Sequence, residues 1–355
     1  MLAPIFHAWE RRLASVTKDR VVRPFEWGEE WMDVGGLGPA RPAGTGEAAV
    51  RAWVDAVMRD SQAFYTAPPT TAYTLTPATP DAAAAGDGGT LTFPSAMVTP
   101  HPENNVVSAR WFPAKGHEAL PRERRRAVVV MPQWNAGAGD HVGLAKLLAR
   151  FGISALRLTK PYHDVRMPPE LSRADYIVSA NVVRTVQVCR QTVLDVRRAV
   201  AWLDQQGFGS IGLLGTSLGS CLSLLTGVHE PLVKAMALNH VSPWFADVVW
   251  RGLSTKHVRA GLDGHITLDT LRDLWAPISP WSYLDRLAGK SALMVYAKYD
   301  LTFPVDLSLT LLHECRRRGL PVEKGVLPCG HYSTGNAPFK FWDAYLMISY
   351  LRRRL

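Results

Sequence analysis

Short apolar runs alternate with longer amphipathic stretches from about residue 127 onward, and this alternation constrains the fold more than any other feature of the chain. The runs expected as strands are 127–131, 153–158, 210–214, 233–238, 291–296 and 322–327. The stretches expected as helices are about 140–151, 172–206, 218 onward, 305–318 and 340–351. Strands and helices in regular succession are typical of a parallel sheet covered by helices on both faces. The sequence therefore predicts an α/β fold with a mostly parallel, doubly wound sheet.

Two regions depart from this rhythm. Residues 91–98 and 106–112 are β-rich runs bounded by Pro, Gly or Asn, so we expect two antiparallel edge strands there. Residues 241–290 are rich in aromatic side chains and have a helical pattern only in pieces. We interpret this stretch as a small helical insert, or lid, on the sheet domain.

Residues 1–88 carry no motif and become rich in Pro, Gly and Ala toward their end, which is typical of a loop or linker. Their first part has an amphipathic pattern that places Ile5, Trp9 and Leu13 on one helical face. Further aromatic side chains are contributed by Trp27, Trp31 and Trp53. We expect an N-terminal extension that packs on the core.

Composition excludes several classes of protein. With 355 residues, of which 47% are hydrophobic, the chain is long enough to bury a large core. The net charge is +9, but the basic residues are dispersed apart from the short runs 122–126 and 352–354, so nucleic-acid binding is not expected. No window is apolar enough for a membrane span, and residues 1–20 are too charged for a signal peptide.

Cysteine usage bears on the compartment. The chain has four cysteines, which are scattered without a CxxC motif or metal-ligand spacing. Reduced core thiols are a better interpretation than disulfides or a zinc site. We therefore expect a cytoplasmic protein with no integral membrane segment.

The segment Gly215-Thr216-Ser217-Leu218-Gly219 joins the run 210–214 to a helix-like stretch and matches the GxSxG pattern. A serine hydroxyl is a weak nucleophile at neutral pH, so an enzyme that uses one places it beside a base and backbone donors. Glycines on either side permit a sharp strand-to-helix turn. Such a turn also occurs where a helix only packs closely on a strand. A base and an acid elsewhere in the chain are therefore needed to identify Ser217 as a nucleophile. The glycine spacing does not fit GxGxxG, which disfavours a dinucleotide site.

Two further residues follow expected strand ends, where open α/β sheets build their sites. Asp300 lies in Tyr299-Asp300-Leu301-Thr302-Phe303-Pro304, just after the run 291–296. His331 lies in Cys329-Gly330-His331, just after the run 322–327. A serine nucleophile needs a base, and an imidazole base needs a carboxylate that fixes its tautomer. Ser217, Asp300 and His331 are therefore the candidate catalytic residues.

On these motifs, residues 90–352 resemble the α/β-hydrolase superfamily, in which nucleophile, acid and histidine follow in this order. The Asp-to-Pro spacing from Asp300 to Pro304 is similar to the acid loop of esterases and dienelactone hydrolases. The resemblance implies a hydrolase domain over residues 89–355, with the lid insert at about 241–290. It also implies no cofactor, no metal and a small-molecule ester substrate, and it leaves the oligomeric state open.

The resemblance also implies an oxyanion hole built from two backbone amides. One is the amide of Leu218, which follows the nucleophile. The other comes from the loop after the run 127–131, where many esterases carry His-Gly and this chain carries Pro132-Gln133. We expect the amide of Trp134 as the second donor, with Gln133 as the fallback.

Four side chains are possible pocket lining: Tyr162, His163, Trp244 and Phe245. The first two belong to a polar loop after the run 153–158, and the last two open the aromatic insert. Each also has a structural interpretation, in which the loop is tied to its neighbours and the aromatic side chains only bury the insert. Among other polar residues, Asp140 is expected as a helix N-cap and Asp306 in the first turn of a helix.

The sequence favours a serine carboxylesterase and leaves alternatives open. An amide hydrolase or acyltransferase would use the same three residues, and a non-catalytic binding module would keep only the scaffold. A metal hydrolase is disfavoured because no HExxH motif is present. A histidine base must be neutral, and the ordinary histidine pKa is about 6.5, so activity is expected to rise through neutral pH.

Overall fold

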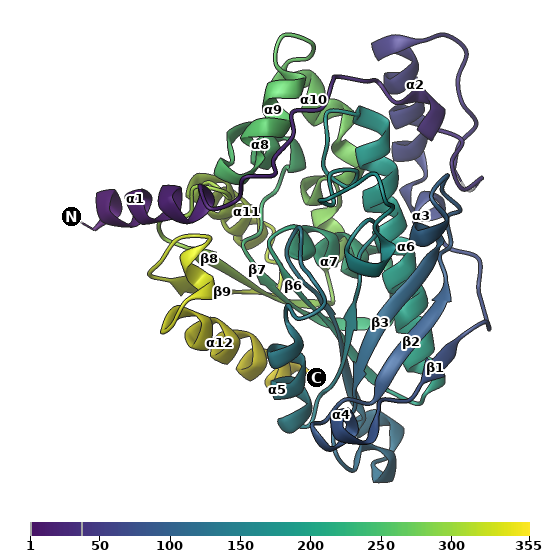
Figure 1. The fold of residues 1–355 in the computed structure, drawn as a ribbon, viewed down its shortest axis with the longest axis vertical. Helices are drawn as coiled ribbons and strands as arrows, with labels where there is room; N and C mark the ends of the chain where they lie inside the picture. The colour runs from purple at the N-terminus through teal and green to yellow at the C-terminus, as the bar shows by residue number, and fades with distance from the viewer. Residues whose placement is uncertain (1, 37) are drawn as a thin grey trace.

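The computed structural model describes residues 2–36 and 38–355, and its centre is a twisted sheet of nine strands in the order β1-β2-β3-β5-β4-β6-β7-β8-β9 (Figure 1). The strands are β1 Thr74–Thr76, β2 Gly89–Pro94, β3 Val106–Phe112, β4 Arg126–Met131, β5 Ser154–Leu158, β6 Ser210–Thr216, β7 Val233–Asn239, β8 Ser291–Ala297 and β9 Val322–Leu327. Strands β5, β4 and β6 to β9 pair in parallel. The expected mostly parallel sheet is therefore confirmed.

The edge strands are antiparallel, as expected: β1 pairs with β2, β2 with β3, and β3 with β5. Strand β1 was not anticipated, because its three residues are too few to show a period and all are exposed. The central strands are almost wholly buried, since helices cover both faces.

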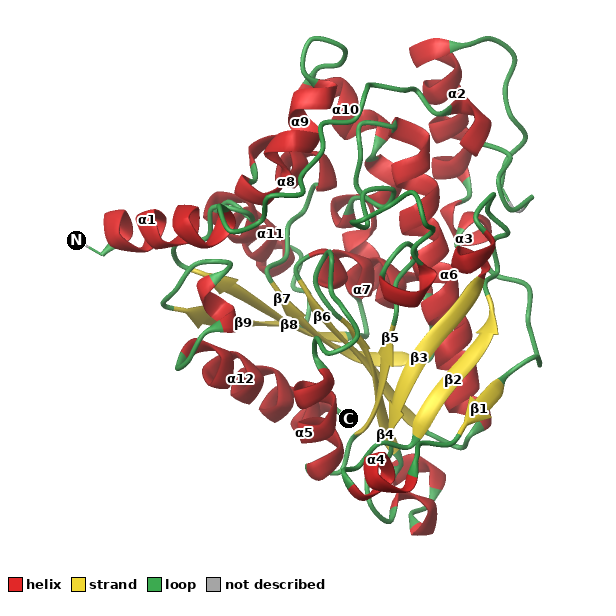
Figure 2. Cartoon of the chain, viewed as in Figure 1, coloured by secondary structure: helices red, strands yellow, loops and turns green. Residues whose placement is uncertain are grey.

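Helices lie on both faces of the sheet (Figure 2). The helices are α1 Ala3–Ala14, α2 Gly46–Arg59, α3 Ser61–Phe64, α4 Pro80–Ala84, α5 Val142–Arg150, α6 Val182–Gln205, α7 Leu218–His229, α8 Phe245–Arg251, α9 Lys256–Leu262, α10 Leu268–Leu274, α11 Val305–Arg317 and α12 Phe339–Arg354. Helices α2, α6, α7 and α11 contribute to the larger core cluster. Helices α5 and α12 form the second cluster on the other face.

One helix start and one N-cap were predicted wrongly. The helix expected at 172–206 begins at Val182, because Asn181 caps it by accepting a hydrogen bond from the amide of Arg184 at 2.9 Å. Asp140 is not the N-cap of α5, since His141 occupies that position. The Asp140 carboxylate instead accepts a hydrogen bond from the amide of Gly137 at 2.9 Å. Asp306 does lie in the first turn of α11.

Residues of the N-terminal stretch pack directly on the sheet domain. Trp31 and Trp53 are buried in the larger core cluster, and Trp27 packs against it. The backbone of Glu26 exchanges hydrogen bonds with Ala180 and Val182, at 3.1 and 3.0 Å.

Helix α1 buries a different face from the one expected. Ile5 is 65% exposed, whereas the buried residues of the helix are Glu10 and Ala14. The apolar period did not predict the buried face, because the polar Glu10 is buried by hydrogen bonds to a loop near the other end of the chain.

The connection between β7 and β8 is helical in pieces, as expected. It contains α8, α9 and α10, followed by short 3₁₀ turns. Figure 1 shows these helices above the ends of the parallel strands, on the side where β6, β7 and β8 lead into their loops. The insert therefore stands next to the region where the candidate residues gather.

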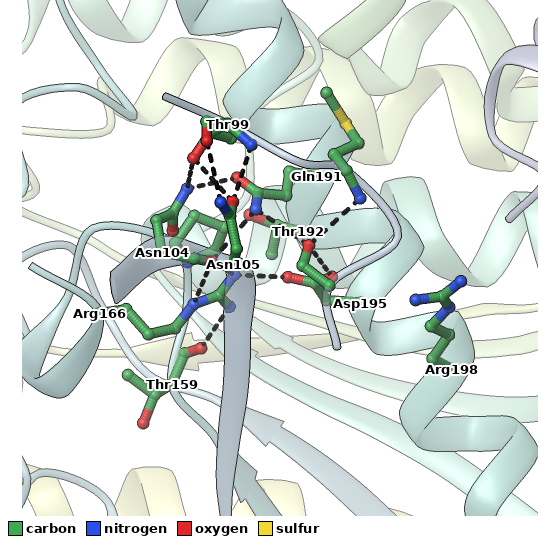
Figure 3. Close-up of polar contacts among 12 residues, drawn as sticks. Thr99, Asn104, Asn105, Thr159, Arg166, Gln191, Thr192, Asp195 and Arg198 are labelled. Carbon is green, nitrogen blue, oxygen red and sulfur yellow. Dashed lines mark hydrogen bonds and ion pairs between the residues drawn. The ribbon is translucent and has the colours of Figure 1, made fainter. Parts of the chain in front are cut away.

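A buried polar network joins α6 to the loop after β5 (Figure 3). Arg166 and Asp195 form a fully buried ion pair at 2.9 Å. The Arg166 guanidinium also donates to the carbonyls of Asn104 and Thr159, at 2.7 and 3.0 Å. These bonds satisfy a charge that would otherwise be costly to bury, so they fix the loop that follows β5.

None of the helices in residues 2–36 and 38–355 combines the length and the apolar character needed to cross a lipid bilayer.

Candidate active site

Ser217 occupies the sharp turn between β6 and α7. Its backbone angles, φ 57° and ψ −123°, lie outside the regions that ordinary side chains prefer. The amide of Ser217 donates to the carbonyl of Asn239 on the neighbouring strand β7, at 2.8 Å. This hydrogen bond fixes the turn to the sheet, and Ser217 lies directly after the end of β6.

The two glycines of the pentapeptide are required by close approach. A Cβ on Gly215 would lie 2.3 Å from the carbonyl oxygen of Gly219. A Cβ on Gly219 would lie 2.1 Å from the carbonyl oxygen of Met131, at the end of β4. Because both contacts are with backbone atoms that cannot move aside, any larger residue would push α7 away from the sheet.

The three residues predicted from strand ends come together. Nε2 of His331 lies 3.1 Å from Oγ of Ser217, and Nδ1 of His331 lies 3.0 Å from Oδ2 of Asp300. Asp300 follows β8 and His331 follows β9, so adjacent parallel strands deliver them to one edge of the sheet. The geometry is that of a nucleophile, a base and an orienting acid.

The Asp300 carboxylate is buried and strongly held. Its Oδ1 accepts hydrogen bonds from the amides of Thr302 and Phe303, both at 2.7 Å. Burial by itself would raise the pKa of this carboxyl, but His331 and His240 outweigh burial and hold the pKa below its usual value. Asp300 is therefore an anion at neutral pH, as an orienting acid must be.

A fourth side chain, His240, joins this group. Its Nδ1 lies 2.7 Å from Oδ2 of Asp300, although the approach is bent away from an ideal hydrogen bond. Its ring lies against His331, with 4.2 Å between the centroids. Burial, followed by the nearby His331, lowers the pKa of His240. It directly follows β7, and this strand-end position is the signal that could have pointed to it in the sequence.

His240, Asp300 and His331 also form a set whose ligand atoms lie within 4.8 Å of one another. These atoms already contact each other, and the other His331 nitrogen contacts Ser217. A cation held there would compete with the link between His331 and Asp300. The arrangement suits proton transfer from a serine better than metal binding.

Comparison with known proteins supports the α/β-hydrolase fold that the sequence predicts. The family described as Alpha/beta hydrolase domain containing 18 matches residues 91–252, a little under half of the chain. No curated protein sequence matches the chain.

Solved structures resemble the chain at low identity. An acetyl xylan esterase from Paenibacillus sp. R4 is 14% identical with a TM-score of 0.58, covering 90% of this chain and 98% of that chain. The acetyl xylan esterase 1 of Thermoanaerobacterium sp. JW/SL YS485 is 13% identical with a TM-score of 0.57, covering 91% and 98%. The Pyrococcus horikoshii acylaminoacyl peptidase is 13% identical with a TM-score of 0.56, covering 70% of this chain and only 40% of the peptidase chain.

The chain has the α/β-hydrolase fold. In this α/β-hydrolase fold, residues of the loop after β4 line the same cavity as Ser217, and buried groups fix the carbonyls of this loop. Nζ of Lys160 donates to the carbonyls of Pro132 and Gln133, at 2.9 and 3.0 Å. In a trans peptide the carbonyl and the next amide point in opposite directions. The amides of Gln133 and Trp134 therefore point away from Lys160.

The loop is fixed a second time by His163. Its Nε2 accepts a hydrogen bond from the amide of Asn135 at 3.1 Å, so the ring proton is on Nδ1, which donates to the carbonyl of Pro161 at 2.8 Å. Burial lowers the pKa of His163, which agrees with a neutral ring. The amide of Asn135 is thus engaged, which leaves the amides of Gln133 and Trp134 as the two candidates predicted for the oxyanion hole. Lys160 was not anticipated, because a lysine usually signals solvent exposure.

A cavity of about 850 Å³ opens above Ser217. The insert and α7 supply an apolar wall made of Leu218, Cys221, Phe245, Val248 and Val249. Helices α5 and α12 supply a second wall made of Leu144, Leu147, Phe341, Ala344 and Met347. Volume and lining are those of a site for a small organic molecule.

The structure corrects three of the four side chains predicted as possible lining. Phe245 lines the cavity, whereas Tyr162, His163 and Trp244 are not among its lining residues. Tyr162 is fully buried behind the loop, where its hydroxyl contacts Nδ1 of His101 at 3.0 Å. His163 serves the loop after β4, and Trp244 packs on Trp281 with 4.8 Å between ring centroids. The structural interpretation therefore holds for these three residues.

Polar side chains also reach the cavity. Nε2 of His141 lies 2.9 Å from Oγ1 of Thr216, the residue before Ser217. Burial, reinforced by Lys160, lowers the pKa of His141 to about 4, so this imidazole is neutral. Arg20 and Arg173 also line the cavity, and the Arg173 guanidinium lies over the ring of Trp134.

Proposed function

We propose that this protein is a serine hydrolase that cleaves carboxylic esters through an acyl-enzyme. The observation that carries the proposal is the chain of contacts from Ser217 Oγ to His331 Nε2, at 3.1 Å, and from His331 Nδ1 to Asp300 Oδ2, at 3.0 Å. The first distance lies within the range over which a positioned imidazole takes a proton from a serine, and the second allows a hydrogen bond that orients the imidazole.

In the first half-reaction, Oγ of Ser217 attacks the ester carbonyl carbon while Nε2 of His331 takes the serine proton. The carbonyl oxygen becomes an oxyanion, to which the amides of Leu218 and Trp134 donate, with the amide of Gln133 as the fallback. The amide of Leu218 is the first of helix α7, so it has no partner within the helix. The carbon–oxygen bond to the alcohol then breaks, and the alcohol leaves with the proton from His331.

In the second half-reaction, His331 takes a proton from a water molecule, whose oxygen attacks the acyl carbon. The bond to Ser217 breaks, and His331 returns the proton to the serine oxygen. Asp300 stays ionised throughout and stabilises the positive charge that His331 carries in each step. No other co-reactant is needed.

The apolar wall under the insert supports an acyl group as the part of the substrate that enters the cavity there. Phe245, Val248 and Val249 belong to α8, so we propose that the insert acts as a lid whose side chains select the acyl chain. Two structural neighbours that match over nearly their full length are named as acetyl xylan esterases, which favours ester cleavage over amide cleavage.

The proposal is tested with short-chain p-nitrophenyl esters and a fluorophosphonate label, comparing the wild type with Ser217→Ala. We expect ester hydrolysis and labelling by the wild type, and loss of both by the variant. Turnover and labelling that persist in Ser217→Ala would overturn the assignment. A matching panel of p-nitroanilides separates ester from amide cleavage, since preference for the anilides would identify an amide hydrolase.

A further inference from the structure

Glu10 of helix α1 contacts the loop that carries His331, although the two lie near opposite ends of the chain. Its Oε2 accepts a hydrogen bond from the amide of Tyr332 at 2.8 Å, and its Oε1 accepts one from the amide of Ser333 at 2.9 Å. Tyr332 directly follows His331. The carboxylate is fully buried and spans two consecutive amides, so it fixes the direction in which this loop leaves the histidine.

Stability alone does not explain a carboxylate at this place. Burying a carboxylate is costly unless it is paired and hydrogen-bonded. Within residues 2–36 and 38–355, Glu10 has no ion-pair partner, so the amides of Tyr332 and Ser333 take that role. Hydrogen bonds from amides to a charged oxygen are stronger than neutral ones. The interaction of Glu10 is thus concentrated on the histidine loop.

Glu10 also leaves no room for a side chain at Gly330, the residue before His331. A Cβ on Gly330 would lie 2.3 Å from the carboxyl carbon of Glu10. Gly330 does not adopt a positive φ, so its backbone does not itself call for glycine. The glycine of the Cys329-Gly330-His331 motif is therefore explained by the presence of Glu10.

Other side chains of the first twenty residues reach the same loops. Nη2 of Arg20 lies 3.1 Å from the hydroxyl of Tyr332, which also contacts Oγ of Ser254 in the insert at 2.8 Å. Phe6 stacks on Tyr299, the neighbour of Asp300, with 4.5 Å between the ring centroids. Figure 1 shows α1 beside the ends of β8 and β9, the strands that lead to Asp300 and His331.

We propose that helix α1 is a positioning element of the active site, in which Glu10 holds the loop that aims Nε2 of His331 at Ser217. Glu10 acts through His331 and does not touch the reacting atoms. The proposal rests on the proposed function of Ser217 and His331, and it assigns to the N-terminal extension a role beyond packing.

The first test compares Glu10→Ala and Glu10→Gln with the wild type. A misplaced base slows the chemical step, so kcat and the rate of fluorophosphonate labelling are expected to fall together by about 10- to 100-fold in Glu10→Ala. KM is expected to change little, because Glu10 is not among the cavity-lining residues. Glu10→Gln keeps one acceptor oxygen and is expected to recover part of the loss.

The matched control is Val200→Ala, a buried truncation in α6 that does not line the cavity. It is expected to lower the melting temperature while kcat per folded molecule stays at the wild-type value. If Glu10→Ala reduces activity only in proportion to its folded fraction, as Val200→Ala does, helix α1 merely packs on the core and the proposal is overturned.

The second test uses the contact between Glu10 and Gly330. Gly330→Ala is expected to lower kcat by about 10-fold or more in the wild type, because the new methyl group displaces the carboxylate. In a Glu10→Ala background the methyl group has room, so the same substitution is expected to cost less than about 2-fold. Independent, multiplicative losses would contradict the proposed contact.

The third test needs no turnover, which separates this proposal from the proposed function. The ring Hε1 signal of His331 in NMR spectra reports the position of the imidazole directly. We expect it to shift or broaden in Glu10→Ala and to match the wild type in Val200→Ala. An unchanged signal overturns the positioning role, whereas absence of Ser217-dependent labelling in the wild type overturns only the proposed hydrolase activity.

Discussion

His240 and Asp300 lie with Nδ1 and Oδ2 only 2.7 Å apart, so the carboxylate that orients His331 is shared between two imidazoles. An oxygen that already faces one donor attracts the second less strongly. His240 is buried and its pKa is lowered, mainly by burial, so it presents a neutral ring to Asp300 at the pH of catalysis. In the proposed mechanism, this pair sets how firmly Asp300 stabilises the protonated form of His331.

His240→Phe keeps a ring against His331 but removes the nitrogen that faces Asp300. The undivided carboxylate should then favour protonated His331 more strongly. We expect the pH at which kcat/KM reaches half its plateau to rise by about 0.5 to 1 unit. The measurement is a pH profile of kcat/KM with a short-chain ester. A profile that keeps its midpoint while only the plateau falls would show that His240 acts through packing alone.

Lys160→Met removes the group that turns the carbonyls of Pro132 and Gln133 away from the cavity. The amide expected to stabilise the oxyanion then loses its fixed direction, and kcat is expected to fall by about 10- to 100-fold. A trifluoromethyl ketone forms an oxyanion on the serine, so its inhibition constant should rise by a similar factor. Loss of kcat with unchanged affinity for this ketone would argue against an oxyanion role for the loop.

Phe245→Ala is expected to enlarge the cavity beside its apolar wall, next to Ser217. The variant should therefore change the preference for the length of the acyl chain. The ratio of kcat/KM for octanoyl over acetyl p-nitrophenyl ester should rise by roughly 10-fold, because longer chains gain contact area. Val248→Phe on the same helix is the converse change and should lower that ratio. If neither variant changes the ratio of kcat/KM for the two esters, the acyl group lies in another part of the cavity.

Asp343 of α12 is predicted to make stability depend on pH. It is buried, and among the described residues its Oδ1 has no hydrogen-bond partner. Burial raises its pKa to about 7, above the ordinary value of 3.8. The folded protein therefore binds more protons between these values, and the free energy of unfolding falls as pH rises through them, by up to about 4 kcal/mol.

Asp343→Asn should remove this dependence. Urea unfolding at pH 5 and pH 8 is expected to show the variant gaining stability relative to the wild type at the higher pH. Asp269→Asn, a change at an exposed aspartate in α10, is the control and should show no such gain. A wild-type-like difference between the two pH values in Asp343→Asn would mean that another group titrates.

Much of the fold and the central site were predictable because they depend on local pattern and chain order. The apolar runs 210–214, 291–296 and 322–327 gave three strands, and the residues that follow parallel strands must meet at one edge of the sheet. Ser217, Asp300 and His331 are joined for that reason. The helix start at Val182 was missed because its cap, Asn181, lies inside a stretch whose composition also suits a helix.

The sequence by itself determined the parallel sheet, the turn at Ser217 and the chain order of Asp300 and His331. The hydrophobic period, the glycine spacing and the strand ends depend only on residues that are neighbours in the sequence. Tertiary structure alone decided the contacts between distant segments. Glu10 reaches Tyr332 across almost the whole chain, and Lys160 is buried only because two loop carbonyls face it. Polar groups of this kind look like surface residues until folding supplies the partners that satisfy them.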